Sequence, residues 1–447
     1  MLEERIAEWR AYVSRRQAIH AVDVDELEDH LRNQVSDLQA GGLDEEEAFL
    51  IAVKRIGDLD ALSQEYAREY SERLWKRLVV TPGAGGGEWN REATVAVGLA
   101  VAAGVSIKIP EFFGVSWDGE MDTIFYVRNL SFFVLPFLTA FLAWKRALPA
   151  GWLAGLAGAF LAAALVMNLM PFVHEGDTQL LAIMHLPMAL WLAVGVAYAG
   201  GRWRDPRQRM NYVRFSGEWF IYYVLIALGG GVLMGITALV FSAAGMDPET
   251  FVTLWILPCG AVGAAVIAGW LVEAKQSVIE NMAPVLTMIF TPLFTLMLLT
   301  FLGTMAWTGN AISVEREVLI AFDLLLVLVV GLLLYAFSAR DPHAEPRFFD
   351  KLQFLLVVCA LLVDAMALWA ILARISEFGF TPNRIAALGE NLILLANLGG
   401  AAVLYALFLR GRKGFASMER WQTNFLPVYL VWAVVVVVLF PIIFRFA

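Results

Sequence analysis

The sequence predicts an all-α protein, in which a small cytoplasmic helical bundle precedes a polytopic membrane domain of about eleven transmembrane helices. Hydrophobic residues make up 59% of the 447 residues, above the roughly 45–50% of soluble proteins. Residues 1–80 hold 18 acids and 11 bases, a balance of −7 out of the chain's −9. We therefore expect a cytoplasmic regulatory bundle over 1–80, a flexible linker over 81–90 and a transmembrane domain over 91–447.

Helical spacing and helix-end signals predict four helices in residues 1–80. Asp23, with Glu26 three residues later, resembles a capping box at the start of the second helix. Asp44 opens the third helix and Gly57 ends it. The expected ranges are about 2–17, 23–40, 44–57 and 59–78.

The composition also excludes several function classes. An acidic head argues against nucleic-acid binding, which requires a basic surface. Two cysteines, Cys259 and Cys359, are too few for a disulfide framework or a metal cage. The sequence has no phosphate-binding glycine loop and none of the usual serine or zinc hydrolase motifs. We therefore expect no cofactor and no metal, and a protein that is more readily a non-enzyme than an enzyme.

Eleven apolar runs after residue 90 are long enough to cross a membrane, which takes about 20 residues per helix. Glycines recur inside them, as in Gly229–Gly231, and either permit close helix packing or mark broken helices. The expected spans are 93–112, 123–143, 150–172, 179–199, 218–243, 251–273, 283–306, 317–337, 351–373, 385–409 and 424–446.

The basic residues between the spans predict the orientation. The loops after the even-numbered spans hold 15 Lys and Arg residues, whereas the alternate loops hold only Arg316, Arg374 and Arg384. Because cytoplasmic loops are enriched in Lys and Arg, we expect the N-terminus inside and the C-terminus outside.

Polar side chains, which are energetically unfavourable inside a membrane, lie within the predicted spans, mostly in their outer half. Because ionisable groups inside a membrane face the bundle interior or a wet cavity, we expect them to converge on an outward-opening polar cavity that binds a ligand or carries protons. Asp364, the deepest, is the strongest candidate. The alternative is a set of internal ion pairs that only hold helices together. The candidates are Asp364, Glu390, Asp323, His185, Lys108, Arg128 and Asn391.

A short loop over 374–384 joins the ninth and tenth spans. Gly379 permits a turn, and Thr381 can cap a helix that begins at Pro382. Arg374 and Arg384 flank this hairpin and complete the set of candidate site residues.

Two stretches resemble known families. The segments Val24–Arg32, Gly42–Phe49 and Ala52–Asp58 resemble the N-terminal permease prefix domain, which is related to HAAS domains. The hairpin loop with Asn391 and the segment Glu419–Asn424 is similar to an uncharacterised polytopic bacterial membrane protein family, known only as a domain of unknown function. The resemblance implies the bacterial cytoplasmic membrane, and a PadR-like regulator or a transporter component as the partner of residues 1–80.

Three functions follow from these expectations. The first is a permease-like protein with an outward-facing polar cavity and a cytoplasmic regulatory head. The second is a membrane sensor or scaffold that signals to a cytoplasmic partner through the head and transports nothing. The third is an intramembrane enzyme that acts on an outer-leaflet lipid or glycan.

Overall fold

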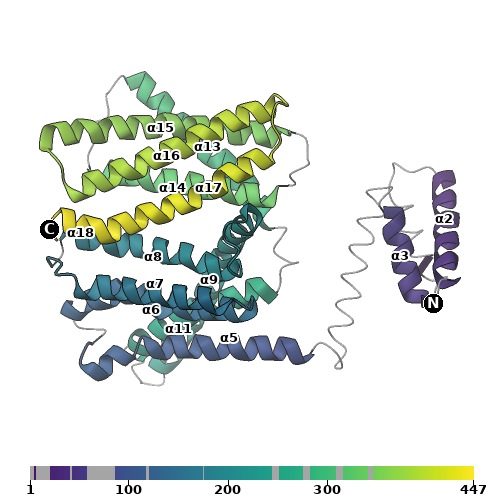
Figure 1. Ribbon diagram of the computed structural model, residues 1–447, viewed down its shortest axis with the longest axis horizontal. Helices are drawn as coiled ribbons and strands as arrows, with labels where there is room; N and C mark the ends of the chain where they lie inside the picture. The colour runs from purple at the N-terminus through teal and green to yellow at the C-terminus, as the bar shows by residue number, and fades with distance from the viewer. Residues whose placement is uncertain are drawn as a thin grey trace. The chain divides into compact units, whose positions relative to one another are not determined.

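The described part of the chain is entirely helical and divides into two compact units, residues 1–92 and 93–447. In the computed structural model (Figure 1), the described residues are 5–6, 21–40, 43–57, 86–116, 120–174, 176–243, 251–274, 282–308, 316–340 and 346–446. The prediction of an all-α protein with many membrane-length helices is therefore confirmed.

The first unit is built on two helices, α2 (Ala21–Ala40) and α3 (Glu45–Gly57). Leu31 and Val35 of α2 and Phe49 of α3 are fully buried, as their helical spacing predicts. Asp44 caps α3, because its Oδ1 accepts hydrogen bonds from the backbone amides of Glu46 and Glu47.

Two expectations for this part of the chain need correction. Helix α2 begins at Ala21, two residues before the expected cap Asp23. Residues 86–90, expected in the linker, form the first turn of α5 (Gly86–Ser106), although the helix starts with two glycines. Of the helices expected over 2–17 and 59–78, only residues 5–6, which are helical, lie within the described residues.

In the second unit, long helices run side by side in a bundle (Figure 1). They begin with α5, the short η1 (Ile109–Phe113), α6 (Glu120–Lys145), α7 (Ala150–Leu169) and α8 (Asp177–Tyr198). They continue with α9 (Pro206–Ala243), η2 (Val252–Ile256), α11 (Leu257–Ala274), α13 (Met282–Thr308) and α14 (Arg316–Ala339). The last are α15 (Phe348–Phe378), α16 (Pro382–Leu409), α17 (Ala416–Val434), η3 (Val435–Leu439) and α18 (Phe440–Ile443).

Ten helices in the described residues are long and apolar enough to cross a membrane, and a shorter apolar stretch, Phe322–Ser338, lies in α14. Each falls on one of the expected spans. Large apolar side chains such as Leu228, Val232 and Leu233 of α9 are more than half exposed. Such surface is stable against lipid and unstable in water, so the architecture is that of a multi-pass membrane protein.

Helix ends differ from expectation where polar residues occupy helical turns. Helix α9 begins at Pro206, so Arg207, Arg209 and Arg214 lie on its first turns and not in a loop. Proline suits the first turn of a helix, where its missing N–H costs nothing. Helix α15 continues to Phe378, so Arg374 is helical and the connection to α16 shrinks to three residues.

Close helix packing does not involve the glycine triplet of α9 but occurs at other glycines, Gly263 of α11 among them, where an added Cβ would lie 3.1 Å from the Ala100 carbonyl oxygen. Gly229–Gly231 lie within the unbroken helix α9, with no atom near enough to be touched by an added Cβ. In α16, an added Cβ would come within 2.0 Å of the Trp432 ring at Gly389, and of the Trp421 ring at Gly400. Two tryptophans of α17, Trp421 and Trp432, therefore pack directly against the α16 backbone.

Candidate functional site

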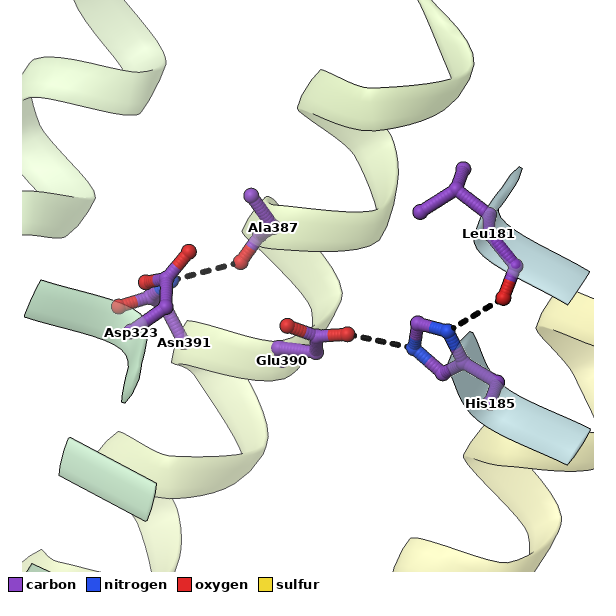
Figure 2. Close-up of polar contacts among 6 residues, drawn as sticks. All are labelled: Leu181, His185, Asp323, Ala387, Glu390 and Asn391. Atoms are coloured by element: carbon purple, nitrogen blue, oxygen red, sulfur yellow. Dashed lines mark hydrogen bonds and ion pairs between the residues drawn. The ribbon is translucent and has the colours of Figure 1, made fainter. Parts of the chain in front are cut away.

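Polar side chains from α8, α14 and α16 meet inside the bundle (Figure 2). His185 lies on α8, Asp323 on α14, and Glu390 and Asn391 are consecutive on α16. Consecutive helical residues point about 100° apart. Glu390 therefore turns towards α8 while Asn391 turns towards α14, and α16 joins the two sides of the site (Figure 2).

His185 and Glu390 form the central contact. Nε2 of His185 lies 2.5 Å from Oε1 of Glu390, and Nδ1 lies 2.8 Å from the carbonyl oxygen of Leu181, one turn earlier on α8. The His185 side chain is 5% exposed and that of Glu390 is 30% exposed. The histidine is thus buried, and its carboxyl partner is only partly covered.

This geometry requires a proton between the two side chains. A backbone carbonyl only accepts hydrogen bonds, so Nδ1 of His185 must carry a proton and donate it to the Leu181 carbonyl oxygen. Nε2 and Oε1 can then approach to 2.5 Å only if one of them carries a further proton. The pair is an imidazolium with a carboxylate, or a neutral imidazole with a carboxylic acid, and is neutral overall in both forms.

Asn391 connects α16 to Asp323. Its Nδ2 donates to Oδ1 of Asp323 and to the carbonyl oxygen of Ala387, both at 2.8 Å. Asn391 is 0% exposed, and its Oδ1 has no hydrogen-bond partner among the described residues. The amide thus uses both donor hydrogens and leaves a buried acceptor available.

Asp364 lies near the middle of α15 and is 0% exposed. Neither of its carboxylate oxygens has a hydrogen-bond partner in the described part of the chain. Asp323 lies within electrostatic range of both Asp364 and Glu390. An ionised carboxylate without a partner is too costly at this depth, so Asp364 must carry a proton or hold a cation.

The cluster therefore holds three carboxyl groups, one buried amide and one histidine. Counted from the first residue of each helix, Glu390 and His185 lie about 12 Å along α16 and α8, at similar distances from the helix ends. Among the described residues, no three His, Cys, Asp or Glu side chains are placed to hold a metal ion. The chemistry that these groups share is the binding and release of protons.

The other two charged candidates are bound elsewhere. Nζ of Lys108 lies 2.5 Å from Oε1 of Glu111 and 4.8 Å from the centre of the Trp255 ring. Arg128 donates to the carbonyl oxygen of Met167 on α7 at 3.3 Å. The expectation that all the charged candidates gather around one cavity is therefore corrected for these two, since they contact nearer groups on α7, η1 and η2.

The two arginines of the hairpin also lie outside the cluster. Nη1 of Arg384 donates to the carbonyl oxygens of Phe378 and Gly379, at 2.9 and 2.8 Å, and so closes the end of α15. Arg374 lies in the last turns of that helix. The predicted cap is confirmed, because Thr381 accepts a hydrogen bond from the Arg384 amide and Pro382 is the first residue of α16.

Sequence reasoning missed a second polar region at the opposite ends of α6, α8 and α11. Glu273 there accepts two hydrogen bonds from Arg146, at 2.8 and 2.9 Å. Glu218, buried on α9, lies in the same region. The sequence did carry a signal for this region, because Glu218 and Glu273 each lie at the edge of an apolar run. The basic residues at the span ends were used only to predict orientation and were not considered as partners of these acids.

No protein-family model, curated protein or solved structure matches this chain.

Proposed function

We propose that the protein is a permease-like integral membrane protein in which protons at the α8–α16 contact and at Asp364 control the arrangement of the bundle. The observation that carries this proposal is the pairing of His185 with Glu390, linked electrostatically through Asp323 to a fully buried Asp364 that has no hydrogen-bond partner among the described residues. Proton-carrying acids and histidines inside a membrane are characteristic of transporters and pumps.

Proton loss gives the cluster two alternative states. While the proton is present, His185 and Glu390 attract each other and hold α8 against α16. Without it, the lone pair of Nε2 faces a carboxylate oxygen, and the contact becomes repulsive. Asp323 couples this change electrostatically to Asp364 on α15. A two-state contact of this kind is the element that alternating access requires.

Orientation and the head complete the proposal. The split of 15 basic residues against three supports a cytoplasmic location for residues 1–80 and an outward position for the helix ends near Glu390. The head then acts as a regulatory domain in the bacterial cytoplasmic membrane, in line with its resemblance to the permease prefix domain.

Proton flux tests the proposal directly. Full-length protein in liposomes that contain a pH-sensitive dye should dissipate an imposed pH gradient faster than protein-free liposomes. Asp364→Asn should remove this flux, because asparagine cannot exchange a proton. Glu377→Gln, at the exposed end of the same helix, is the matched control and should keep the flux. Equal flux in Asp364→Asn and the unaltered protein would contradict the proposal, as would flux no faster than in protein-free liposomes.

A sensor or scaffold remains the second candidate, and one observation favours it. Residues 1–92 form a separate compact unit with a buried core of their own. Under this alternative, the membrane bundle changes state with pH and the head binds a cytoplasmic regulator. Crosslinking of the full-length protein in cells should then recover one specific partner through the head, while the liposome assay shows no flux.

A further inference from the structure

A cavity of about 270 Å³ opens between the ends of α6, α8, α9 and α11. It lies at the end of the bundle that the basic loops predict to be cytoplasmic, away from the His185–Glu390 pair. Its lining includes three arginines, one acid and two neutral polar side chains. These residues are Arg146, Arg202, Arg214, Glu218, Gln208 and Asn211.

The surroundings of the cavity carry an excess of positive charge. Lys145 and Arg146 both approach Glu273, with nitrogen–oxygen distances of 3.9 and 2.8 Å. Arg202, Arg214 and Glu218 line the cavity, and Glu419 lies within electrostatic range of Arg214 and Arg207, so five bases and three acids lie at or near it. The excess is two positive charges, so an anion is attracted to the cavity even while all three acids are ionised.

Two of the arginines are held in place before any ligand arrives. Arg146 makes two hydrogen bonds to Glu273, and its guanidinium lies 4.7 Å from the centre of the Tyr198 ring. Arg214 donates to the carbonyl oxygen of Ser338 on α14. Because these contacts fix the guanidinium planes, an anion that binds them does not have to order them.

Arg202 differs from the other two. It lies in the turn between α8 and α9, is exposed, and its side chain has no hydrogen bond or ion pair within the described ranges. Its guanidinium is therefore available to bind a ligand that also contacts Arg146 and Arg214.

We propose that this cavity binds a phosphate group. Guanidinium groups bind phosphate oxygens through paired, charge-assisted hydrogen bonds, and Gln208 and Asn211 offer further amide donors. The cavity lies where the helices leave the apolar layer, and basic pockets between transmembrane helices on this side take lipid head groups. The two sources of the group are an anionic phospholipid of the inner leaflet and a soluble phosphate compound.

Lipid binding to the full-length protein separates these sources. Native mass spectrometry should count bound phosphatidylglycerol at concentrations where phosphatidylcholine does not bind. Arg202→Gln should weaken phosphatidylglycerol binding by about tenfold, the effect of losing one charge-assisted contact. Arg204→Gln removes another exposed charge from the same turn, outside the cavity lining, and should leave binding unchanged. Arg214→Gln, inside the cavity, should weaken binding at least as much as Arg202→Gln.

A thermal-shift titration with inorganic phosphate gives the second arm. If phosphate stabilises the protein, and less so after Arg202→Gln, the cavity takes a soluble phosphate compound. If only phosphatidylglycerol binds, the lipid is the source. The proposal fails if neither probe binds, if Arg202→Gln binds both probes as the unaltered protein does, or if Arg204→Gln loses as much binding as Arg202→Gln. None of these results depends on proton flux, so this proposal and the proposed function can fail separately.

Discussion

The two polar regions of the membrane bundle treat buried charge in opposite ways. At the end of the bundle with the cavity, two buried acids pair with arginines: Glu273 with Arg146, and Asp350 with Arg340. In the α8–α14–α15–α16 cluster, three carboxyl groups share one histidine, and Asp364 has no hydrogen-bond partner in the described residues. The first region meets the cost of burial with permanent charges, whereas Asp364 in the second must carry a proton or hold a cation. We therefore expect pH sensitivity to concentrate in the second region.

The largest effect on stability should come from breaking the buried ion pair between Arg340 and Asp350. Asp350 is 2% exposed and is held by Arg340 at 2.9 and 3.0 Å. Arg340→Met leaves a buried, unpaired carboxylate and should lower the free energy of unfolding by about 3–5 kcal/mol. Unfolding of the detergent-solubilised full-length protein by denaturant measures this loss.

The double variant Arg340→Met/Asp350→Asn is the control for that prediction. Asparagine removes the charge but keeps an acceptor for the Arg347 amide, which caps α15. Most of the lost stability should return. If the double variant is as unstable as the single one, packing of Arg340 against Phe408 and Phe415 matters more than its charge.

The next effect should depend on pH. The His185–Glu390 contact needs its shared proton, so losing that proton as pH rises should weaken the contact. The contact should contribute about 1.5–3 kcal/mol, the range for a hydrogen bond to a charged group. Glu390→Gln can donate to a neutral Nε2 without an added proton. The thermal midpoint of this variant should therefore fall less with rising pH.

The matched control for the pH series is Glu377→Gln, which changes an exposed acid near the end of α15. It should keep the pH dependence of the unaltered protein. Asp323 and Asp364 also face the cluster, so Glu390→Gln should weaken the dependence without removing it. An unchanged pH profile in Glu390→Gln would show that the contact does not hold a proton.

A packing change on α16 should distinguish effects on stability that depend on protonation from effects that depend only on side-chain volume. Gly400→Ala would place a Cβ within 2.0 Å of the Trp421 ring and should cost about 1–3 kcal/mol at every pH. Gly399→Ala is the control, because nothing lies within 4 Å of its added Cβ. It should be neutral or stabilise α16 by up to about 1 kcal/mol. Denaturant unfolding at two pH values would show whether these effects are independent of pH.

The smallest effect should come from the hairpin. Arg384→Gln loses the bonds to the carbonyl oxygens of Phe378 and Gly379 and should cost about 1 kcal/mol. Arg410→Gln, exposed at the other end of α16, should cost less than about 0.5 kcal/mol. Thermal unfolding of both variants would compare them, and equal losses would argue against a role for Arg384 in closing the loop.

The sequence predicted helices, spans and depth far better than contacts. Hydropathy located the membrane helices because a lipid-facing helix must be apolar along its whole length. The sequence predicted that the polar side chains lie mostly in the outer half of the spans, and His185, Asp323 and Glu390 meet in the structure with Asn391 as a link. The angular position of a side chain depends on which helices are neighbours, and one sequence does not encode that directly. For the same reason, the separate partner of Lys108 and the pairing of Arg146 with Glu273 were not foreseen.

Infrared spectroscopy of Asp364 tests the central claim most directly. A protonated carboxyl group and a carboxylate absorb at different frequencies, so the full-length protein at neutral pH should show a protonated carboxyl band from the membrane bundle. Asp364→Asn should remove that band, and Glu377→Gln should keep it. A spectrum in which Asp364→Asn leaves the protonated carboxyl band unchanged would contradict the claim that the buried acids of this bundle are held neutral by protons.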